Sequence, residues 1–351
     1  MSYILIALSL LSGEYTSLRR ASLLELLAGH YIQAEVLART AIESARSHDD
    51  QYAEALSYSD LGDALQAQGR FLEAEREYRD AISILNQQSE RSHATAIVWR
   101  SLASDLTSEK RYREARAALK QAATLISKNR IQDPSLSAAV LNSLGVVQFD
   151  EGKVDKAERS FTRAALLPWD PNTLGNAGLW EILSNMGQVY QTRHQTVKAE
   201  EAYSQSLHLA ELQMGTGHPT LAILHTNLGS FYSDMGRLSE AEKHFQLSLA
   251  ILEGANVRGA DATLMHTLYE LAGTYIREHQ EARAEPLLAQ ATTIARKHAA
   301  AGEMPEIAEI FDMYSRVLKD LSNASEAEHL QSEARRVRAA MALTVPVGSL
   351  R

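Results

Sequence analysis

Twelve histidines are the residues of this chain best suited to metal binding or acid–base chemistry, and their spacing supports neither. His218 and His225 lie seven residues apart, which could place both on one face of a helix, but no third ligand accompanies them. The stretch from Glu278 to Glu281 reads Glu-His-Gln-Glu and lacks the His-Glu-x-x-His order that holds zinc on one helix. We therefore predict ordinary surface or packing histidines and no metal site.

Signatures of nucleotide binding and of nucleophilic catalysis are also missing from the sequence. The glycines fall at turns or at repeated helix positions, so none forms a loop that could cradle a phosphate. No serine lies in the context of a nucleophile elbow. The chain has no cysteine, which excludes disulfides and thiol-based metal or redox sites. We expect a protein that is not an enzyme and that needs no cofactor.

Amide side chains provide a different kind of chemistry. Asn185 and Asn227 each stand immediately before a Met-Gly or Leu-Gly pair, and Asn142 lies one position earlier in the preceding copy. An asparagine can donate and accept hydrogen bonds together, so a series of them could hold an extended peptide backbone without reading its charge. The alternative is that these asparagines only cap helices or solvate a surface.

Residues 227–245 show which elements must position these side chains. Apolar residues recur there at helical spacing on both sides of Gly236, which predicts two amphipathic helices joined by a tight turn. Gly236 can end the first helix because a residue without a Cβ adopts a left-handed conformation at no steric cost. Gly229 and Ala241 are both small and lie twelve residues apart, so we expect the two helices to cross closely at this pair.

The same pair of small residues recurs along nearly the whole chain. The copies are Gly62/Ala74, Ala103/Ala115, Gly145/Ala157, Gly187/Ala199, Gly229/Ala241 and Ala272/Ala284, with degraded copies at Ser22/Ala34 and Ser315/Ala327. Successive alanines of these pairs lie 40 to 43 residues apart. A helix pair repeated at a constant period predicts an all-α array in which each copy packs on its neighbours.

The predicted organisation has three parts. Residues 1–16 form an apolar N-terminal segment, residues 17–340 a solenoid and residues 341–351 a flexible tail. The predicted repeats are 17–48, 51–88, 92–128, 134–167, 173–214, 219–254, 260–300 and 305–340. Asp133 should cap the helix that Pro134 opens. Pro286 is tolerated only in the first turn or so of a helix, so its helix should begin close to Glu281 or Ala282.

These features resemble the tetratricopeptide repeat, whose pattern is a Leu-Gly-x-x-Tyr helix followed by an Ala-x-x-x-Phe-x-x-Ala helix. The matching segments are Leu228-Gly229-x-x-Tyr232, Met186-Gly187-x-x-Tyr190 and Ala157-x-x-x-Phe161-x-x-Ala164. The period exceeds the family's usual length of about 34 residues. Two segments, Gly217-His218-Pro219 and Ala284-Glu285-Pro286-Leu287, resemble the long repeats of kinesin light chains. The resemblance implies a right-handed α-solenoid of about eight helix-turn-helix repeats.

In a solenoid of this kind the first helix of each repeat lines an inner groove. The residues we expect in that groove are Arg100, Asn142, Asn185, Gln188, Asn227, Ser230 and Tyr269. In kinesin-light-chain-like repeats an asparagine at the place of Asn185 and Asn227 contacts bound peptide, and the resemblance carries this role to both and less securely to Asn142. Other copies depart from it, with Asp60, Ser101 and Glu270 at that position.

We therefore predict a non-catalytic scaffold or adaptor that binds a peptide or a partner domain along residues 142–277. The alternative is a regulatory or sensing module of a larger signalling system that responds to a small ligand or oligomerises. The net charge of −9 argues against nucleic acid as the partner. Basic runs such as Arg111 to Arg113 alternate with glutamates, which is typical of a solvated helix face.

The apolar run from Tyr3 to Leu11 has the length of a signal-peptide core. No lysine or arginine precedes it, and it is too short to span a bilayer. Three interpretations stay open: a helix that caps the first repeat, a remnant of a signal sequence with a misplaced start, and a functional signal. We expect a cytoplasmic protein without an integral membrane segment, with export as the alternative.

Overall fold

The computed structural model describes residues 14–87, 91–168, 178–255, 261–298 and 306–344, and its helices follow one another without a strand in these ranges. The helices are α2 (Glu14–Leu27), α3 (Tyr31–Ser47), α4 (Gln51–Ala67), α5 (Phe71–Leu85), α6 (Ser92–Ser108), α7 (Tyr112–Lys128), α8 (Pro134–Asp150), α9 (Val154–Ala165), α10 (Leu179–Thr192), α11 (Thr196–Met214), α12 (Thr220–Asp234), α13 (Leu238–Ala255), α14 (Asp261–Arg277), α15 (Glu281–His298), α16 (Glu306–Asp320) and α17 (Ala324–Thr344).

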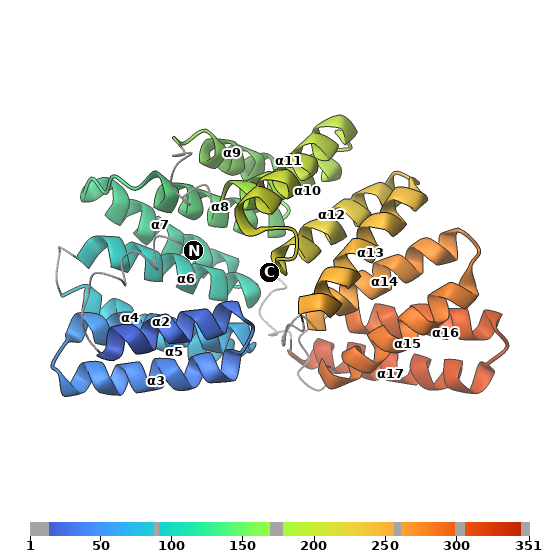
Figure 1. The fold of residues 1–351 in the computed structure, drawn as a ribbon, viewed down its shortest axis with the longest axis horizontal. Coiled ribbons are helices and arrows are strands. Elements are labelled where there is room, and N and C mark those ends of the chain that lie inside the picture. Colours follow the sequence, from blue (N-terminus) through green and yellow to red (C-terminus); the bar gives the residue numbers. More distant parts are fainter. Residues whose placement is uncertain (1–13, 88–90, 169–177, 256–260, 299–305, 345–351) are drawn as a thin grey trace. The chain divides into compact units, whose positions relative to one another are not determined.

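The chain divides into two compact units, residues 1–213 and 214–351, which we call the N-terminal unit and the C-terminal unit. Figure 1 draws the first from blue to green and the second from yellow to red. In each unit, consecutive helices pack as pairs, such as α4 with α5 and α12 with α13, and each second helix also contacts the first helix of the next pair. The predicted all-α array of eight helix pairs, α2/α3 to α16/α17, is confirmed.

The apolar segment predicted for residues 1–16 lies outside the described residues except for its end, where Glu14 begins α2. At the other terminus α17 continues to Thr344, so this helix reaches into the predicted tail, and the rest of that tail is not described. None of the helices in the described ranges combines the length and the apolarity that a bilayer span would need.

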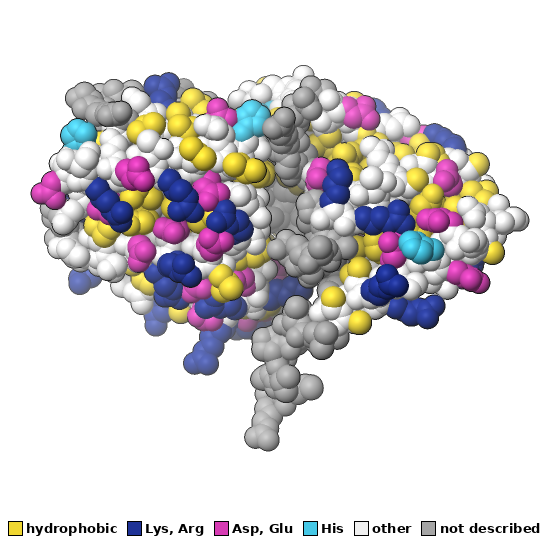
Figure 2. Space-filling model, turned by 90° about the horizontal axis from the view of Figure 1, so that it is seen from below, with side chains coloured by type: hydrophobic (Ala, Val, Ile, Leu, Met, Phe, Trp, Pro, Cys, Tyr) yellow, Lys and Arg dark blue, Asp and Glu magenta, His cyan; other side chains and the backbone are white. Residues whose placement is uncertain are grey.

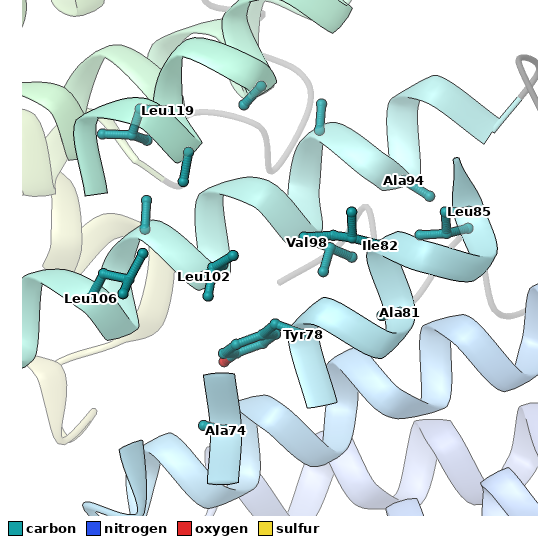
Figure 3. Packing of buried hydrophobic residues seen from close by; sticks show 14 of the residues in the cluster. Ala74, Tyr78, Ala81, Ile82, Leu85, Ala94, Val98, Leu102, Leu106 and Leu119 are labelled. Atoms are coloured by element: carbon teal, nitrogen blue, oxygen red, sulfur yellow. The ribbon is translucent and has the colours of Figure 1, made fainter. Parts of the chain in front are cut away.

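The helix crossings show why small residues recur twelve apart. A Cβ atom added to Gly229 would lie 2.6 Å from the ring of Phe245, which follows Ala241 by four residues. The ring therefore occupies the space that a side chain at Gly229 would need, and Ala241 beside it is completely buried. The same contact joins Gly62 to Tyr78, Gly145 to Phe161 and Gly187 to Tyr203. Figure 3 shows the Tyr78 ring of α5 between Ala74 of the same helix and Leu102 of α6.

The pair Gly187/Ala199 adds one detail to the expected crossing. The atoms nearest to a Cβ added at Gly187 belong to the Tyr203 ring, at 2.6 Å, so this ring fills the space beside Gly187. A helical side chain leans toward the N-terminus of its helix, which brings the Tyr203 ring back over the turn of Ala199.

The alanines of the pairs are core residues of the helix crossings. Each of them is completely buried, so they pack the repeat and offer no surface to a ligand: Ala74, Ala115, Ala157, Ala199, Ala241 and Ala284.

At the remaining crossings, both residues that meet differ in size from those at the glycine crossings. Where alanine replaces glycine, at Ala103 and Ala272, the residue four after the second alanine is leucine instead of an aromatic residue, Leu119 or Leu288. In the two terminal copies the first position is serine, and its hydroxyl donates to the carbonyl oxygen of the partner alanine. Ser22 donates to Ala34 and Ser315 to Ala327, each at 2.8 Å. The degraded copies therefore keep the close crossing through a hydrogen bond.

Local signals in the sequence also define the helix ends. The predicted left-handed turn at Gly236 is confirmed, with φ of 71°. Asp133 accepts a hydrogen bond from the Leu136 amide at 2.9 Å, which confirms it as the cap of α8. α15 begins at Glu281, as predicted, but Pro286 is its sixth residue and therefore lies beyond the four amides that have no partner within a helix.

Ion pairs link the second helices of successive repeats in the N-terminal unit. Arg70, which precedes α5, contacts Glu35 of α3 at 2.7 Å, and Arg111, which precedes α7, contacts Glu75 of α5 at 2.5 Å. Arg111 also pairs with Glu114 in the first turn of α7. Figure 2 shows basic and acidic side chains interspersed on the face seen from below. The basic run that begins at Arg111 thus belongs to a network of mixed charge.

Candidate functional site

The first helices of the N-terminal unit bring their polar side chains onto one surface. α2 packs on α4, α4 on α6, α6 on α8 and α8 on α10. We call this the N-terminal inner surface and define it by Arg19, Asp60, Asp63, Gln66, Arg100, Ser101, Ser104, Asn142, Glu181 and Asn185. Hydrogen bonds join its helices, since Arg19 donates to Asp60 at 2.6 Å and Gln66 donates to Ser104 at 3.2 Å.

The predicted asparagines Asn142 and Asn185 meet on this surface. Asn185 of α10 donates its Nδ2 to Oδ1 of Asn142 on α8 at 2.9 Å, and Asn142 donates its own Nδ2 to Glu181 at 2.9 Å. Asn142 is buried, whereas Asn185 is half-buried. Asn142 therefore orients its neighbours, and Asn185 is the asparagine of this pair that a ligand can reach.

Glu181 is the residue that the sequence analysis missed. It lies one helical turn before Asn185, so the two share a face of α10. The residue as a whole is exposed, but protein around its carboxylate desolvates this group and so raises its pKa. The charge of Arg100 and the hydrogen bond from Asn142 oppose this increase. Its spacing from Asn185 was visible in the sequence, while its contact with Asn142 depends on the packing of α8 against α10.

Asp63 is a second carboxylate with a perturbed pKa. The Tyr78 hydroxyl donates to its Oδ1 at 2.7 Å. Desolvation nevertheless raises the pKa of Asp63 to about 6, against the opposing effects of Tyr78, Arg100 and Ser101. The same Tyr78 ring packs over Gly62, so the core of this repeat and its inner surface share one side chain.

Arg100 occupies an unusual position in the repeat. The corresponding residues are Ser59, Asn142, Ser184 and Thr226, which are all small or medium-sized and buried. The arginine stem therefore passes between helices, and its Nε atom is inaccessible and without a hydrogen-bond partner. Among the described residues, none forms a hydrogen bond or an ion pair with the Arg100 guanidinium.

An open cavity of about 460 Å³ lies in front of Arg100. Its lining residues are Leu26, Tyr31, Asp63, Gln66, Ala67, Arg100, Ser101 and Ser104. They come from four helices, α2, α3, α4 and α6, so the cavity forms only when two successive repeats stack on the first. The cavity offers donors, acceptors and a small apolar wall together.

The other predicted site residues are distributed over both units. Gln188 lies half-buried on α10, directly after the buried Gly187. Asn227 and Ser230 are half-buried on α12 of the C-terminal unit. Tyr269 of α14 lines an open cavity of about 450 Å³ together with residues of α16 and α17. Asn185 and Asn227 therefore belong to different units.

His218 and His225 do not share a helix face. His218 precedes α12 and its Nδ1 accepts from the Thr220 amide at 3.2 Å, so only His225 lies on this helix. His225 instead lies 3.0 Å from His244 of α13, Nδ1 to Nδ1. Burial lowers the pKa of both, that of His225 to about 4. In the described ranges no three His, Asp or Glu side chains gather as a metal site would require.

Comparison with known sequences identifies the repeat. Residues 53–128 and 181–254 match the tetratricopeptide repeat family. The Tonsoku-like protein of Bos taurus is 28% identical to this chain over 140 residues, which are 40% of this chain and 9% of that protein. The chain thus spans less than a tenth of the length of this relative.

Solved structures with the same fold share little sequence with this chain. A Rap protein complexed with Competence and Sporulation Factor has a TM-score of 0.57 at 14% identity, covering 96% of this chain and 78% of its own. A signal transduction ATPase with a tetratricopeptide repeat sensor, from Pyrococcus horikoshii, also scores 0.57 at 12% identity, covering 95% and 48%. The Rap conjugation regulator of plasmid pLS20, in complex with the Phr* peptide, scores 0.51 at 12% identity, covering 96% and 77%. With the repeat matches and this helix-pair architecture, the chain is a tetratricopeptide-repeat protein.

Proposed function

We propose that the chain is a non-catalytic interaction module that holds an extended peptide, or an extended part of a partner protein, on its inner surfaces. The observation that carries this proposal is the N-terminal inner surface itself. Five successive first helices contribute polar side chains to it, and hydrogen bonds between helices hold several of them in place. Side chains fixed in this way lose little conformational entropy when a ligand binds.

The chemistry of Asn185 suits a peptide backbone. One N–H of its amide is engaged by Asn142, while its Oδ1 atom forms no hydrogen bond with any described residue. A carbonyl oxygen of this kind can accept from a peptide N–H, and the second amide hydrogen can donate to a peptide carbonyl. The two Rap structures with a bound factor or peptide have the same fold, which supports a ligand of this class.

The test is binding of a partner by the full chain and by asparagine variants. Asn185→Ala and Asn227→Ala, singly and together, would be compared with wild type by affinity purification and then by titration of the recovered partner. Asn129→Ala serves as the matched control, because Asn129 is exposed at the end of α7 and away from the first helices. We expect Asn185→Ala to weaken binding at least about tenfold, equivalent to 1.4 kcal/mol, while circular dichroism shows that the variant keeps the wild-type fold. A folded double variant that binds like wild type would refute the proposal.

A sensing module is the second candidate function, and one observation favours it. The ATPase with a tetratricopeptide repeat sensor covers 95% of this chain at a TM-score of 0.57. In this case the ligand would be small, and binding would alter the association of the chain rather than tether a partner. A thermal-shift screen followed by measurement of the oligomeric state would separate the two functions, because a scaffold requires no change in oligomeric state upon ligand binding.

A further inference from the structure

We propose that the chain binds a phosphate group of a soluble ligand in a cavity beside the turn between α8 and α9. The cavity is open, has a volume of about 550 Å³ and lies where this turn meets the end of α10. We call it the turn cavity, and its lining residues are Gly152, Lys153, Val154, Asp155, Lys156, Arg159, Thr192 and Arg193. None of them belongs to the N-terminal inner surface, so this inference does not rest on the proposed function.

The corresponding turns of three other repeats carry an arginine and, three residues later, a glutamate. The arginine guanidinium pairs with the glutamate carboxylate in Arg70/Glu73, Arg111/Glu114 and Arg237/Glu240. The same two positions, four residues and one residue before the repeated alanine, hold Lys153 and Lys156 in front of Ala157. A cation thus stands where those repeats have a carboxylate. A bound anion would take the place of the missing carboxylate.

The turn and α9 carry three carboxylates, and each of them has an ion-pair partner. The pairs are Glu151 with Lys153 and Arg116, Asp155 with Arg193, and Glu158 with Arg193. Three cations therefore balance three carboxylates. Two further cations, Lys156 and Arg159, line the turn cavity, and neither side chain has a hydrogen bond or an ion pair within the described ranges. The cavity thus keeps two uncompensated positive charges, although the net charge of the chain is −9.

The two uncompensated cations lie together on α9. Lys156 and Arg159 are three residues apart and both exposed, so they share one face of this helix. Like charges on neighbouring turns of a helix repel each other, and a bound anion would remove this repulsion. The N-terminus of α9 also faces the turn cavity, since Val154 and Asp155 line it, and no side chain caps this end. Its unpaired amides favour the same charge of ligand.

The amount of charge and the size of the cavity suit a phosphate monoester. Such a group carries a charge of about −1.5 to −2 at pH 7 and three acceptor oxygens, which match one ammonium and one guanidinium. A volume of about 550 Å³ is within the range of ligand sites, about 300–1,000 Å³, so the group that carries the phosphate also has room.

Two larger classes of anionic partner fit this site less well. Recognition of an anionic membrane typically uses clusters of about 4–8 basic residues. Nucleic acid likewise requires an extended basic surface. The turn cavity offers only two uncompensated cations in an acidic chain. The geometry therefore favours a soluble ligand with a single phosphate group.

The experiment measures binding of defined probes to the full chain by isothermal titration calorimetry in about 50 mM NaCl, where charge screening is weak. The peptide probes are acetyl-Gly-phosphoserine-Gly-amide and the same peptide with glutamate or serine at the centre. Glycerol phosphate and inorganic phosphate are the small probes. Co-sedimentation with phosphatidylcholine vesicles in which about one lipid in five is phosphatidic acid tests the membrane as a source of the phosphate.

Three variants locate the site. Lys156→Glu restores the glutamate of the other repeats next to Lys153, so it should keep the fold and at least the wild-type melting temperature while weakening binding of the phosphoserine peptide at least about tenfold. Arg159→Gln should weaken binding at least about threefold. Arg163→Gln is the matched control, because Arg163 is exposed on the same helix and does not line the cavity. It should change the dissociation constant by less than about twofold.

We expect wild type to bind the phosphoserine peptide at least about tenfold more tightly than the glutamate and serine peptides. Equal affinity for glycerol phosphate would support the site and show that the phosphate is sufficient. A preference for the phosphoserine peptide over both small probes would support it and identify a phosphorylated protein segment as the ligand.

Four results would overturn the proposal: no binding of any soluble phosphate, equal binding of the glutamate peptide, an equal loss in Arg163→Gln and Lys156→Glu, or binding to the vesicles alone. None of these results would affect the proposed function, because the asparagine variants of the inner surfaces test that function separately.

Discussion

The two units use the same repeat but place different titratable groups in their interiors. In the N-terminal unit, the buried or enclosed groups are carboxylates, and desolvation raises the pKa of Asp63 to about 6 and that of Asp105 to about 7. In the C-terminal unit they are imidazoles, and burial lowers the pKa of His225 to about 4 and also lowers that of His244. Desolvation disfavours the charged form in every case, and the sign of the shift follows from which form is charged.

Asp105 shows how far a single position can depart from the repeat. Its counterparts in later copies include Val147 and Val189, which are buried apolar residues. Asp105 is equally buried, with 0% of its surface exposed, and neither of its carboxylate oxygens has a hydrogen-bond partner among the described residues. The helix crossings are thus shared by both units, whereas the polar groups between them are particular to each unit. This difference teaches that repeat geometry does not determine how stability responds to pH.

The largest expected effect concerns the crossings of glycine with an aromatic ring, which both units share. Gly145→Ala in the N-terminal unit and Gly229→Ala in the C-terminal unit should each destabilise their unit by about 3 kcal/mol, because the new methyl group meets an aromatic ring. The loss should be the same at pH 5 and pH 8, as measured by hydrogen exchange of each unit in the full chain.

Two variants control this prediction. Gly273→Ala should be neutral or stabilising by up to about 1 kcal/mol, since the nearest atom to its new Cβ would be the Met313 Cε at 3.8 Å and alanine favours the helix. Adding Phe245→Leu to Gly229→Ala recreates the Ala–Leu combination found at Ala272 and Leu288, and should recover at least half of the loss. No recovery would mean that the ring is not the cause.

The second-largest expected effect is a pH dependence of the stability of the N-terminal unit, caused by Asp105. The folded chain keeps a proton on Asp105 up to about pH 7, whereas an unfolded aspartate loses it near pH 4. The free energy of unfolding should therefore fall as the pH rises from about 4 to 7 and stay constant above that. Asp105→Val should stabilise this unit by about 2 kcal/mol at pH 8 and by less at pH 5. Equal effects at both pH values would show that the carboxylate is ionised in the folded chain throughout.

The C-terminal unit should respond to acid in the opposite direction. His225 is 6% exposed, and its folded pKa lies below the unfolded value of about 6.5. The unfolded chain therefore binds more protons, and stability should be lost as the pH falls from about 6.5 to 4, by about 2–3 kcal/mol. His225→Leu should flatten this loss without changing the response of the N-terminal unit. If the stabilities of the two wild-type units changed with pH in the same direction, the proposed difference between their buried groups would be wrong.

The smallest effect concerns the turns within helix pairs, which both units share. Glycine adopts positive φ at Gly69 and Gly236, but Lys110 and His279 adopt it at the equivalent turns, with φ of 60° and 57°. Lys110→Gly and His279→Gly should each stabilise their unit by about 0.5–1 kcal/mol, because glycine avoids the steric cost of the left-handed conformation. Gly236→Ala provides the converse test, with a loss of about 1 kcal/mol. Any dependence of these changes on pH would contradict a purely steric origin.

Much of the fold could be predicted because local rules repeat. Gly236 as a helix end, Asp133 as a cap and Pro286 near the start of its helix each follow from the backbone preferences of one residue. The pairing of helices follows from small residues at a constant spacing. The resemblance to kinesin light chains stays a prediction.

The candidate site could be predicted only in part. Asn142 and Asn185 were expected on one surface and do lie there, but the sequence did not reveal that Asn142 is buried and bonded to both Asn185 and Glu181. Such contacts join residues about 40 positions apart and depend on how neighbouring repeats stack.

The close contacts within a repeat show a similar limit. A Cβ added at Gly187 would meet the Tyr203 ring first, and one added at Gly229 would meet the Phe245 ring. The spacing of small residues locates the crossing, but which side chain fills it depends on the direction in which the ring points.

The sequence by itself determined the helix pairs, their turns and the places where helices approach closely, because these depend on residue size and backbone conformation within one repeat. The tertiary structure decided which polar groups find partners. Nothing in the sequence around Asp105 and Arg100 indicates their surroundings. Within the described ranges, stacking of the repeats leaves the Asp105 carboxylate buried without a hydrogen bond and the Arg100 guanidinium beside a cavity without one. Whether a polar group is satisfied depends on atoms from other repeats, and the spacing of residues along the chain does not specify their positions.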